Sequence, residues 1–197
     1  MIQWLQHNWL EIFGALTGLL YIYLEIKGNI WLWPVGIISS VVYIIVFFVS
    51  KFYADMSLQV YYLIISIYGW ALWARKKETL ADKKELKISR VPKKIYLLLI
   101  IITLVLWAAI GIFLDKLTDS PIPYWDAFTT ALSITATWML AKKYIEQWII
   151  WIIADLVSMG LYIYKDLIPT AILFTVFTTM AFVGYFNWLK IMRTVNE

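Results

Sequence analysis

Long apolar runs separated by short charged stretches form the dominant pattern along this chain. Seven such runs reach about membrane length, so each predicts a transmembrane helix. With 62% hydrophobic residues and a mean hydropathy of +0.76, the predicted fold class is an all-α integral membrane protein with seven transmembrane helices. The expected spans are, approximately, 4–24, 29–50, 54–74, 95–114, 124–141, 145–164 and 167–189.

Positive charge is concentrated between the third and fourth apolar runs. Residues 75–94 hold nine Lys and Arg side chains against three acids. No aromatic side chains are interleaved with these bases, so we interpret the segment as a cytoplasmic loop and expect no nucleic-acid partner. With the N-terminus outside, the cytoplasmic side receives fourteen bases and the outer side three. This bias predicts a multi-pass protein with its N-terminus outside and its C-terminus in the cytoplasm. The membrane that we expect is the cell (inner) membrane.

The two ends of the chain resemble each other. Residues 4–74 align on residues 119–189 without a gap at an offset of 115. The alignment predicts a 3+1+3 parallel repeat: a first three-helix bundle, the basic loop, a linker helix at 95–114, and a second three-helix bundle. Transporters of this build hold their substrate between the halves, which we expect to rock around it. The paired identities include Phe13/Phe128, Lys27/Lys142, Trp33/Trp148, Leu58/Leu173, Gly69/Gly184 and Trp73/Trp188.

An acid lies in the middle of the sixth apolar run. Trp148, Trp151 and Asp155 stand at i, i+3 and i+7, so a helix places them on one face. Asp155 would lie near mid-bilayer, where ionisable side chains usually serve function. Two aromatic walls and one negative charge suit a flat cationic or polar ring system. The alternative is structural: the acid pairs with another helix and the tryptophans pack or lie at the interface.

Several blocks resemble the PnuC family of vitamin transporters along essentially the whole chain. In the second half, Lys143–Trp151 is similar to that family's Glu-Asn-Trp-x-x-Trp pattern, with Gln147 in place of the Asn. The resemblance implies a SWEET-like fold and assigns substrate contact to Gln147, Trp148 and Trp151. The other blocks are Asn29–Gly36, Tyr53–Asp55, Leu58–Val60, Tyr68–Trp70 and Tyr124–Asp126.

The resemblance also implies an activity. Members move a vitamin precursor by facilitated diffusion, most often nicotinamide riboside, and a cytoplasmic kinase traps the arriving substrate by phosphorylation. Thiamine, riboflavin and deoxynucleosides are substrates of other members, so thiamine or another vitamin remains an alternative. A sugar carrier of the SWEET type and a non-transporting membrane receptor are the rival classes. The sequence leaves monomer and homo-oligomer open.

Further polar residues lie within or at the ends of the spans. Gln59, Tyr62 and Ser66 stand at i, i+3 and i+7 and form a second polar stripe. These side chains either join helices by hydrogen bonds or contact the ribose or ring of the substrate. Gate or hinge candidates, each with an interfacial or structural alternative, are Glu11, Asp126, Pro34 and Asn187.

Signatures of enzymes are missing from the sequence. There is no phosphate loop, no H-E-x-x-H and no G-x-S-x-G, and the chain has one histidine and no cysteine. We therefore expect neither catalytic residues nor a metal site or cofactor. The expected partners are a small vitamin and the lipid bilayer.

Overall fold

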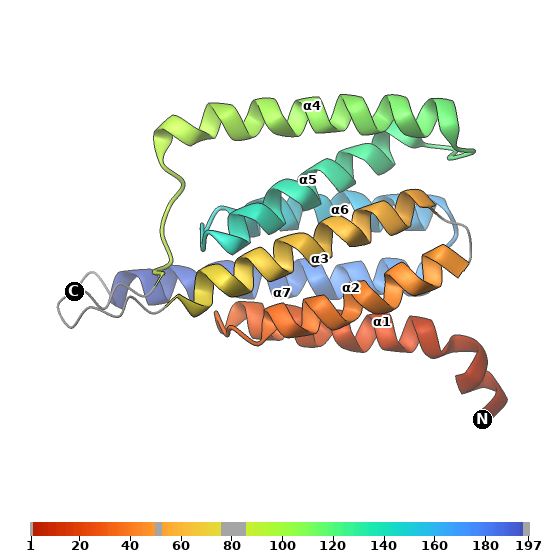
Figure 1. Ribbon diagram of the computed structural model, residues 1–197, viewed down its shortest axis with the longest axis horizontal. Coiled ribbons are helices and arrows are strands. Elements are labelled where there is room, and N and C mark those ends of the chain that lie inside the picture. The colour runs from red at the N-terminus through yellow and green to blue at the C-terminus, as the bar shows by residue number, and fades with distance from the viewer. Residues whose placement is uncertain (1, 50–52, 76–85, 195–197) are drawn as a thin grey trace. The chain divides into compact units, whose positions relative to one another are not determined.

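The computed structural model describes residues 2–49, 53–75 and 86–194, and the side chains of 2–8, 11, 53 and 54 lie outside this description. The described chain is almost entirely helical, as the apolar pattern predicts (Figure 1). The helices are α1 (Ile2–Ile26), α2 (Leu32–Val49), α3 (Tyr53–Ala74), α4 (Lys93–Leu117), α5 (Pro123–Ala141), α6 (Gln147–Tyr164) and α7 (Ile168–Thr194).

The chain divides into two compact units, residues 1–86 and residues 87–197. In the first unit α2 packs against both α1 and α3. In the second unit α4 packs on α5, α5 on α6 and α6 on α7. The helix predicted as a linker between bundles is therefore α4, and it belongs structurally to the second unit, where Figure 1 shows it beside α5.

Five of the described helices, α2, α3, α4, α6 and α7, have the length and apolarity of a membrane span. The most apolar is α4, whose outer side chains such as Leu97 and Val105 are more than half exposed, as a lipid-facing surface requires. The helix α5 is less apolar because Thr and Ser recur along it. Most of those hydroxyls donate to the carbonyl four residues earlier, which satisfies them inside the helix.

The same turn precedes the second helix of each bundle. Gly28 and Lys143 both have left-handed backbone, with φ of 61° and 54°, and they are separated by the predicted offset of 115. Each turn closes the preceding helix with two amide-to-carbonyl hydrogen bonds at corresponding positions. In the first unit Gly28 and Asn29 donate to carbonyls of α1, and in the second Lys143 and Tyr144 donate to carbonyls of α5. The local geometry matches the ungapped alignment.

A packed tryptophan also recurs in the two units. In the first unit the Trp33 ring lies against Gly69 and meets Trp73 edge to face at 5.4 Å between centroids. A β-carbon at Gly69 would overlap the Trp33 ring, so only glycine admits this packing. In the second unit Trp148, Gly184 and Trp188 repeat the arrangement, with a centroid distance of 5.6 Å.

Residues 76–85, half of the predicted basic loop, lie outside the described chain. The described remainder is ordered by pairing that the hydropathy pattern does not indicate. The Ser89 amide donates to the Lys143 carbonyl at 3.0 Å, and the Ile145 amide donates to the Ser89 carbonyl at 2.9 Å. Lys93 and Lys94, which we assigned to the loop, instead begin α4.

Candidate substrate site on α6

A polar stripe runs along α6 on the side that carries Asp155. Gln147, Trp151, Asp155 and Ser158 follow one another at intervals of four, four and three residues, so they share one helix face. Three of them are nearly inaccessible: Gln147 is 0%, Asp155 5% and Ser158 9% exposed. We call these four residues the α6 stripe. An apolar helix gains nothing from burying such groups unless they have partners.

Asp155 is the strongest functional candidate of the stripe. Among the residues that the structure describes, no hydrogen bond or ion pair reaches its carboxylate. Burying an unpaired carboxylate is costly, and in membrane helices such residues mark substrate or ion pathways. Its position in the first unit, at the same offset of 115, is Ser40, which is also buried but carries no charge. The charge is therefore a feature of the second unit alone.

Gln147 also lacks a hydrogen bond within the described part of the chain. Both its amide oxygen and its amide nitrogen are inaccessible and unpartnered. A buried amide left unsatisfied costs about 1–3 kcal/mol per group. A ligand offering one donor and one acceptor would remove that cost.

Trp151 is half-buried on the same face, and its indole N–H is buried without a partner among the described residues. The corresponding position in the first unit is Gly36, which lies against Tyr21 of α1 and Ser66 of α3. Two alanines, Ala136 and Ala181, occupy the positions that correspond to Tyr21 and Ser66, and both are fully buried. Large and small residues are thus exchanged between the units: the second unit has Trp151 where the first has Gly36, and alanines where the first has Tyr21 and Ser66.

Trp148 does not share this environment. It lies one residue from Gln147, is 0% exposed, and its ring is enclosed by Gly184 and Trp188 of α7. Among the described residues its indole N–H has no hydrogen-bond partner, but neither has that of the equivalent Trp33 in the first unit, so this feature accompanies the packing. In this structure Trp148 packs α6 on α7, and its spacing of seven residues puts it on the same side of α6 as Asp155. Contact of Trp148 with substrate stays a prediction.

The three residues of the predicted polar stripe on α3 lie within one continuous helix, so their spacing puts them on one face. Gln59 and Tyr62 are half-buried, and Ser66 is 3% exposed. The Ser66 hydroxyl lies against α2, 2.9 Å from the point where a β-carbon at Gly36 would stand. Contact of these three residues with substrate stays a prediction.

The predicted gate residues have varied surroundings. Asp126 accepts a hydrogen bond from the Ser120 hydroxyl at 2.7 Å and forms an ion pair with Lys165 at 3.0 Å, which links the start of α5 to the end of α6. Pro34 lies in the first turn of α2, where a missing amide is tolerated, and Asn187 is half-buried on α7. The side chain of Glu11 lies outside the described residues.

Glu146 is an anchoring residue that we did not single out from the sequence. Its carboxylate accepts hydrogen bonds from the Val91 amide at 3.0 Å and the Tyr96 hydroxyl at 3.1 Å, and Arg90 lies 3.7 Å away. It therefore ties the start of α4 to the turn before α6. Its position beside the Gln147-Trp148 pair was the available signal, but an acid at a predicted helix start is ordinarily solvated.

Comparison with known proteins identifies relatives along the whole chain. A model of the nicotinamide mononucleotide transporter family matches residues 8–190. The nicotinamide riboside transporter PnuC of Escherichia coli (strain K12) is 26% identical, over 94% of this chain and 87% of that protein. The PnuC protein of Neisseria mucosa is 27% identical over 94% of this chain and 74% of its own length. The riboflavin/roseoflavin transporter RibM of Streptomyces davaonensis is 22% identical over 91% and 84%.

The fold has a solved counterpart as well. A crystal structure of the vitamin B3 transporter PnuC superposes with a TM-score of 0.74 at 26% identity, covering 95% of this chain and 83% of that one. These proteins are transporters and not enzymes, in agreement with the missing catalytic motifs. The apolar helices, the intramembrane polar stripe and a family match along nearly the full sequence lead to one conclusion: this chain is a multi-pass membrane protein that belongs to the nicotinamide mononucleotide transporter family.

Proposed function

We propose that this protein imports a vitamin precursor carrying a flat cationic ring, nicotinamide riboside first, by facilitated diffusion. The observation that carries the proposal is the buried, unpaired carboxylate of Asp155 on the same helix face as Trp151. The named activities of the PnuC relatives support the choice of nicotinamide riboside.

The α6 stripe offers one contact for each part of such a molecule. The pyridinium ring of nicotinamide riboside stacks on the Trp151 indole, and its positive charge lies toward Asp155. Cation–π attraction contributes about 2 kcal/mol when both groups are desolvated. The carboxamide pairs with the unsatisfied amide of Gln147, since it offers one donor and one acceptor face. Trp148 supports this surface from behind through its packing on α7.

Two alternatives follow from the same chemistry. Thiamine also carries a permanent ring cation, so Asp155 does not distinguish it from nicotinamide riboside, whereas the carboxamide contact of Gln147 does. Riboflavin, the substrate in the name of the relative RibM, has an uncharged ring. A neutral ring leaves the Asp155 carboxylate unpaired in the membrane, which disfavours riboflavin here.

The direction of transport is determined by the substrate gradient and by what happens to the substrate after it has entered the cell. Within the α6 stripe, the one carboxylate balances the permanent substrate cation and leaves no second acid for a coupled ion, so we expect flux to follow the substrate gradient. A cytoplasmic kinase then retains the product by phosphorylation. The distribution of basic residues supports a cytoplasmic C-terminus, so a reporter fused after Arg193 should be active only on that side.

Counterflow in proteoliposomes tests the function. Vesicles loaded with unlabelled nicotinamide riboside should accumulate labelled nicotinamide riboside without a proton or sodium gradient. Trp151→Ala should abolish this uptake, and Trp70→Ala, an exposed tryptophan on α3, serves as the matched control. Uptake that requires an ion gradient would overturn the uncoupled mechanism. Absence of counterflow by a folded, binding-competent protein would favour a receptor.

A further inference from the structure

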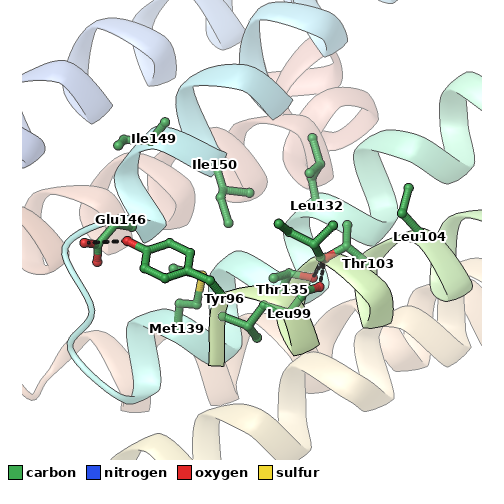
Figure 2. A pocket seen from close by; sticks show the side chains of 11 residues that line it. Tyr96, Leu99, Thr103, Leu104, Leu132, Thr135, Met139, Glu146, Ile149 and Ile150 are labelled. Carbon is green, nitrogen blue, oxygen red and sulfur yellow. Dashed lines mark hydrogen bonds between the residues drawn. The ribbon is translucent and has the colours of Figure 1, made fainter. Parts of the chain in front are cut away.

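An apolar groove runs along the second unit, away from the α6 stripe. It has a volume of about 380 Å³ and is formed by α4, α5 and α6 (Figure 2). Apart from Glu146, Tyr96 and a Thr103–Thr135 hydrogen bond of 2.7 Å, its walls are aliphatic or sulfur-containing. Ile100, Leu104 and Ile149 are 54%, 52% and 44% exposed, so the groove is open along its side. Helices of this apolarity lie in lipid, so an open groove between them is filled by lipid or by protein.

One end of the groove is basic. Glu146 and Tyr96 close this end, and Leu104 lies toward the other (Figure 2). Arg90, Lys93 and Lys94 gather at the start of α4 beside Tyr96, and all three are exposed. Of the described residues at this end, the acid is Glu146, which accepts hydrogen bonds from the Val91 amide and the Tyr96 hydroxyl and pairs with Arg90. These three bases and one acid have a net charge of +2, which makes the groove entrance attractive to an anion.

The length of the groove matches one lipid chain in one leaflet. From Tyr96 to Leu104 the helix rises about 12 Å, at roughly 1.5 Å per residue. Half of a hydrocarbon core is about 15 Å. An anion at the basic end joined to an apolar tail along the groove is the form of an anionic phospholipid.

We propose that this groove holds an acyl chain of an anionic phospholipid whose phosphate is bound by Arg90, Lys93 and Lys94. The lipid lies over the start of α4, which Glu146 ties to the turn before α6. The bound lipid thereby holds α4 against α6, the helix that carries the α6 stripe. The proposal is independent of which vitamin is carried.

Lipid titration of the delipidated full-length protein in detergent tests the proposal, with binding read by native mass spectrometry. Phosphatidylglycerol should bind at least tenfold more tightly than phosphatidylcholine with the same chains. The variant K93Q/K94Q should weaken phosphatidylglycerol binding by about thirtyfold, at about 1 kcal/mol per basic residue near the membrane surface. The matched control K116Q/K190Q removes the same charge from exposed lysines elsewhere and should keep the preference. Equal binding of both lipids, or equal losses in both variants, would overturn the headgroup assignment.

Two further experiments test whether an acyl chain occupies the groove. Leu104→Trp fills the groove and should lower phosphatidylglycerol binding at least tenfold while an unchanged melting temperature shows intact folding.

Because the sequence has no cysteine, I100C provides a single labelling site in the groove. A fluorophore there should be quenched by phosphatidylglycerol that carries a nitroxide on its chain. Disulfide-linked dimers of I100C would show that a second copy covers the groove, and displacement of the lipid by nicotinamide riboside would show a vitamin site. Either result would overturn the proposal.

Discussion

The Trp148 ring meets the Trp188 ring edge to face, with centroids 5.6 Å apart and planes at 89°. Trp33 and Trp73, each 115 residues earlier, meet at 5.4 Å and 87°. Such pairs contribute about 0.5–1.5 kcal/mol beyond the area they bury. The recurrence of this pair in both units indicates that it fastens the second helix of each bundle to the third, and it separates the packing role of Trp148 from the substrate role we propose for Trp151.

The glycines beside these tryptophans should be intolerant of any side chain. Gly184→Ala places a methyl group 2.5 Å from the Trp148 ring, so we expect a loss of about 1–3 kcal/mol in the free energy of unfolding. Gly69→Ala should behave alike against Trp33. Unfolding of the purified protein in detergent, followed by tryptophan fluorescence, measures the effect.

Gly160→Ala in α6 is the matched control. No atom of the described residues lies within 4 Å of a β-carbon built there, so alanine should leave stability unchanged or raise it by about 0.5–1 kcal/mol through its helix propensity. Similar losses at Gly160 and Gly184 would contradict the packing account.

The left-handed turns predict opposite effects at equivalent positions. Gly28→Ala should cost about 1 kcal/mol of unfolding free energy, although a β-carbon there meets nothing within 4 Å, because φ is 61°. Lys143→Gly should stabilise by about 0.5–1 kcal/mol, since it relieves the same strain at φ 54°. Lys142→Gly, at φ −88°, removes the neighbouring charge without that relief and should destabilise. If Lys142→Gly and Lys143→Gly both stabilised the protein, the gain would come from removal of a charge and not from relief of backbone strain.

Glu146 should matter for stability more than its place at a helix start suggests. Glu146→Ala leaves the Val91 amide without its acceptor and frees Tyr96 and Arg90, so we expect a loss of about 2–3 kcal/mol. Tyr96→Phe removes one hydrogen bond and should cost about 1 kcal/mol. Hydrogen exchange at the Val91 amide should accelerate in Glu146→Ala but not in Tyr96→Phe. Unchanged exchange in Glu146→Ala would contradict the anchoring role.

Helix positions were largely predictable from the sequence because apolar runs bounded by charges determine where a chain crosses the membrane. The helix α2 starts at Leu32, a few residues later than expected, because residues 27–31 form the turn centred on Gly28. The start of α4 at Lys93 was also missed, since hydropathy counts a lysine as loop whereas Pro92 provides a helix start there.

The candidate site was predictable only in part. Helical spacing predicted that Trp148, Trp151 and Asp155 share one face, and in the structure one continuous helix carries all three. Helical spacing did not reveal that Gly184 lies against the Trp148 ring, because this contact joins α6 to α7. The Glu146 anchor likewise depends on a backbone amide 55 positions earlier in the chain, and periodicity within one helix carries no information about such a partner.

The most direct test of the proposed site is calorimetric titration of nicotinamide riboside into wild-type protein and Asp155→Asn. The substitution preserves shape and removes only the charge. We predict a loss of affinity of at least thirtyfold, corresponding to about 2 kcal/mol or more for a buried charge pair. The melting temperature of the free protein should be unchanged or higher, because the costly unpaired charge is removed. Asp115→Asn, the same change at an exposed acid of α4, should bind like wild type. Equal affinities of wild type and Asp155→Asn would contradict the proposal that this carboxylate binds the vitamin cation.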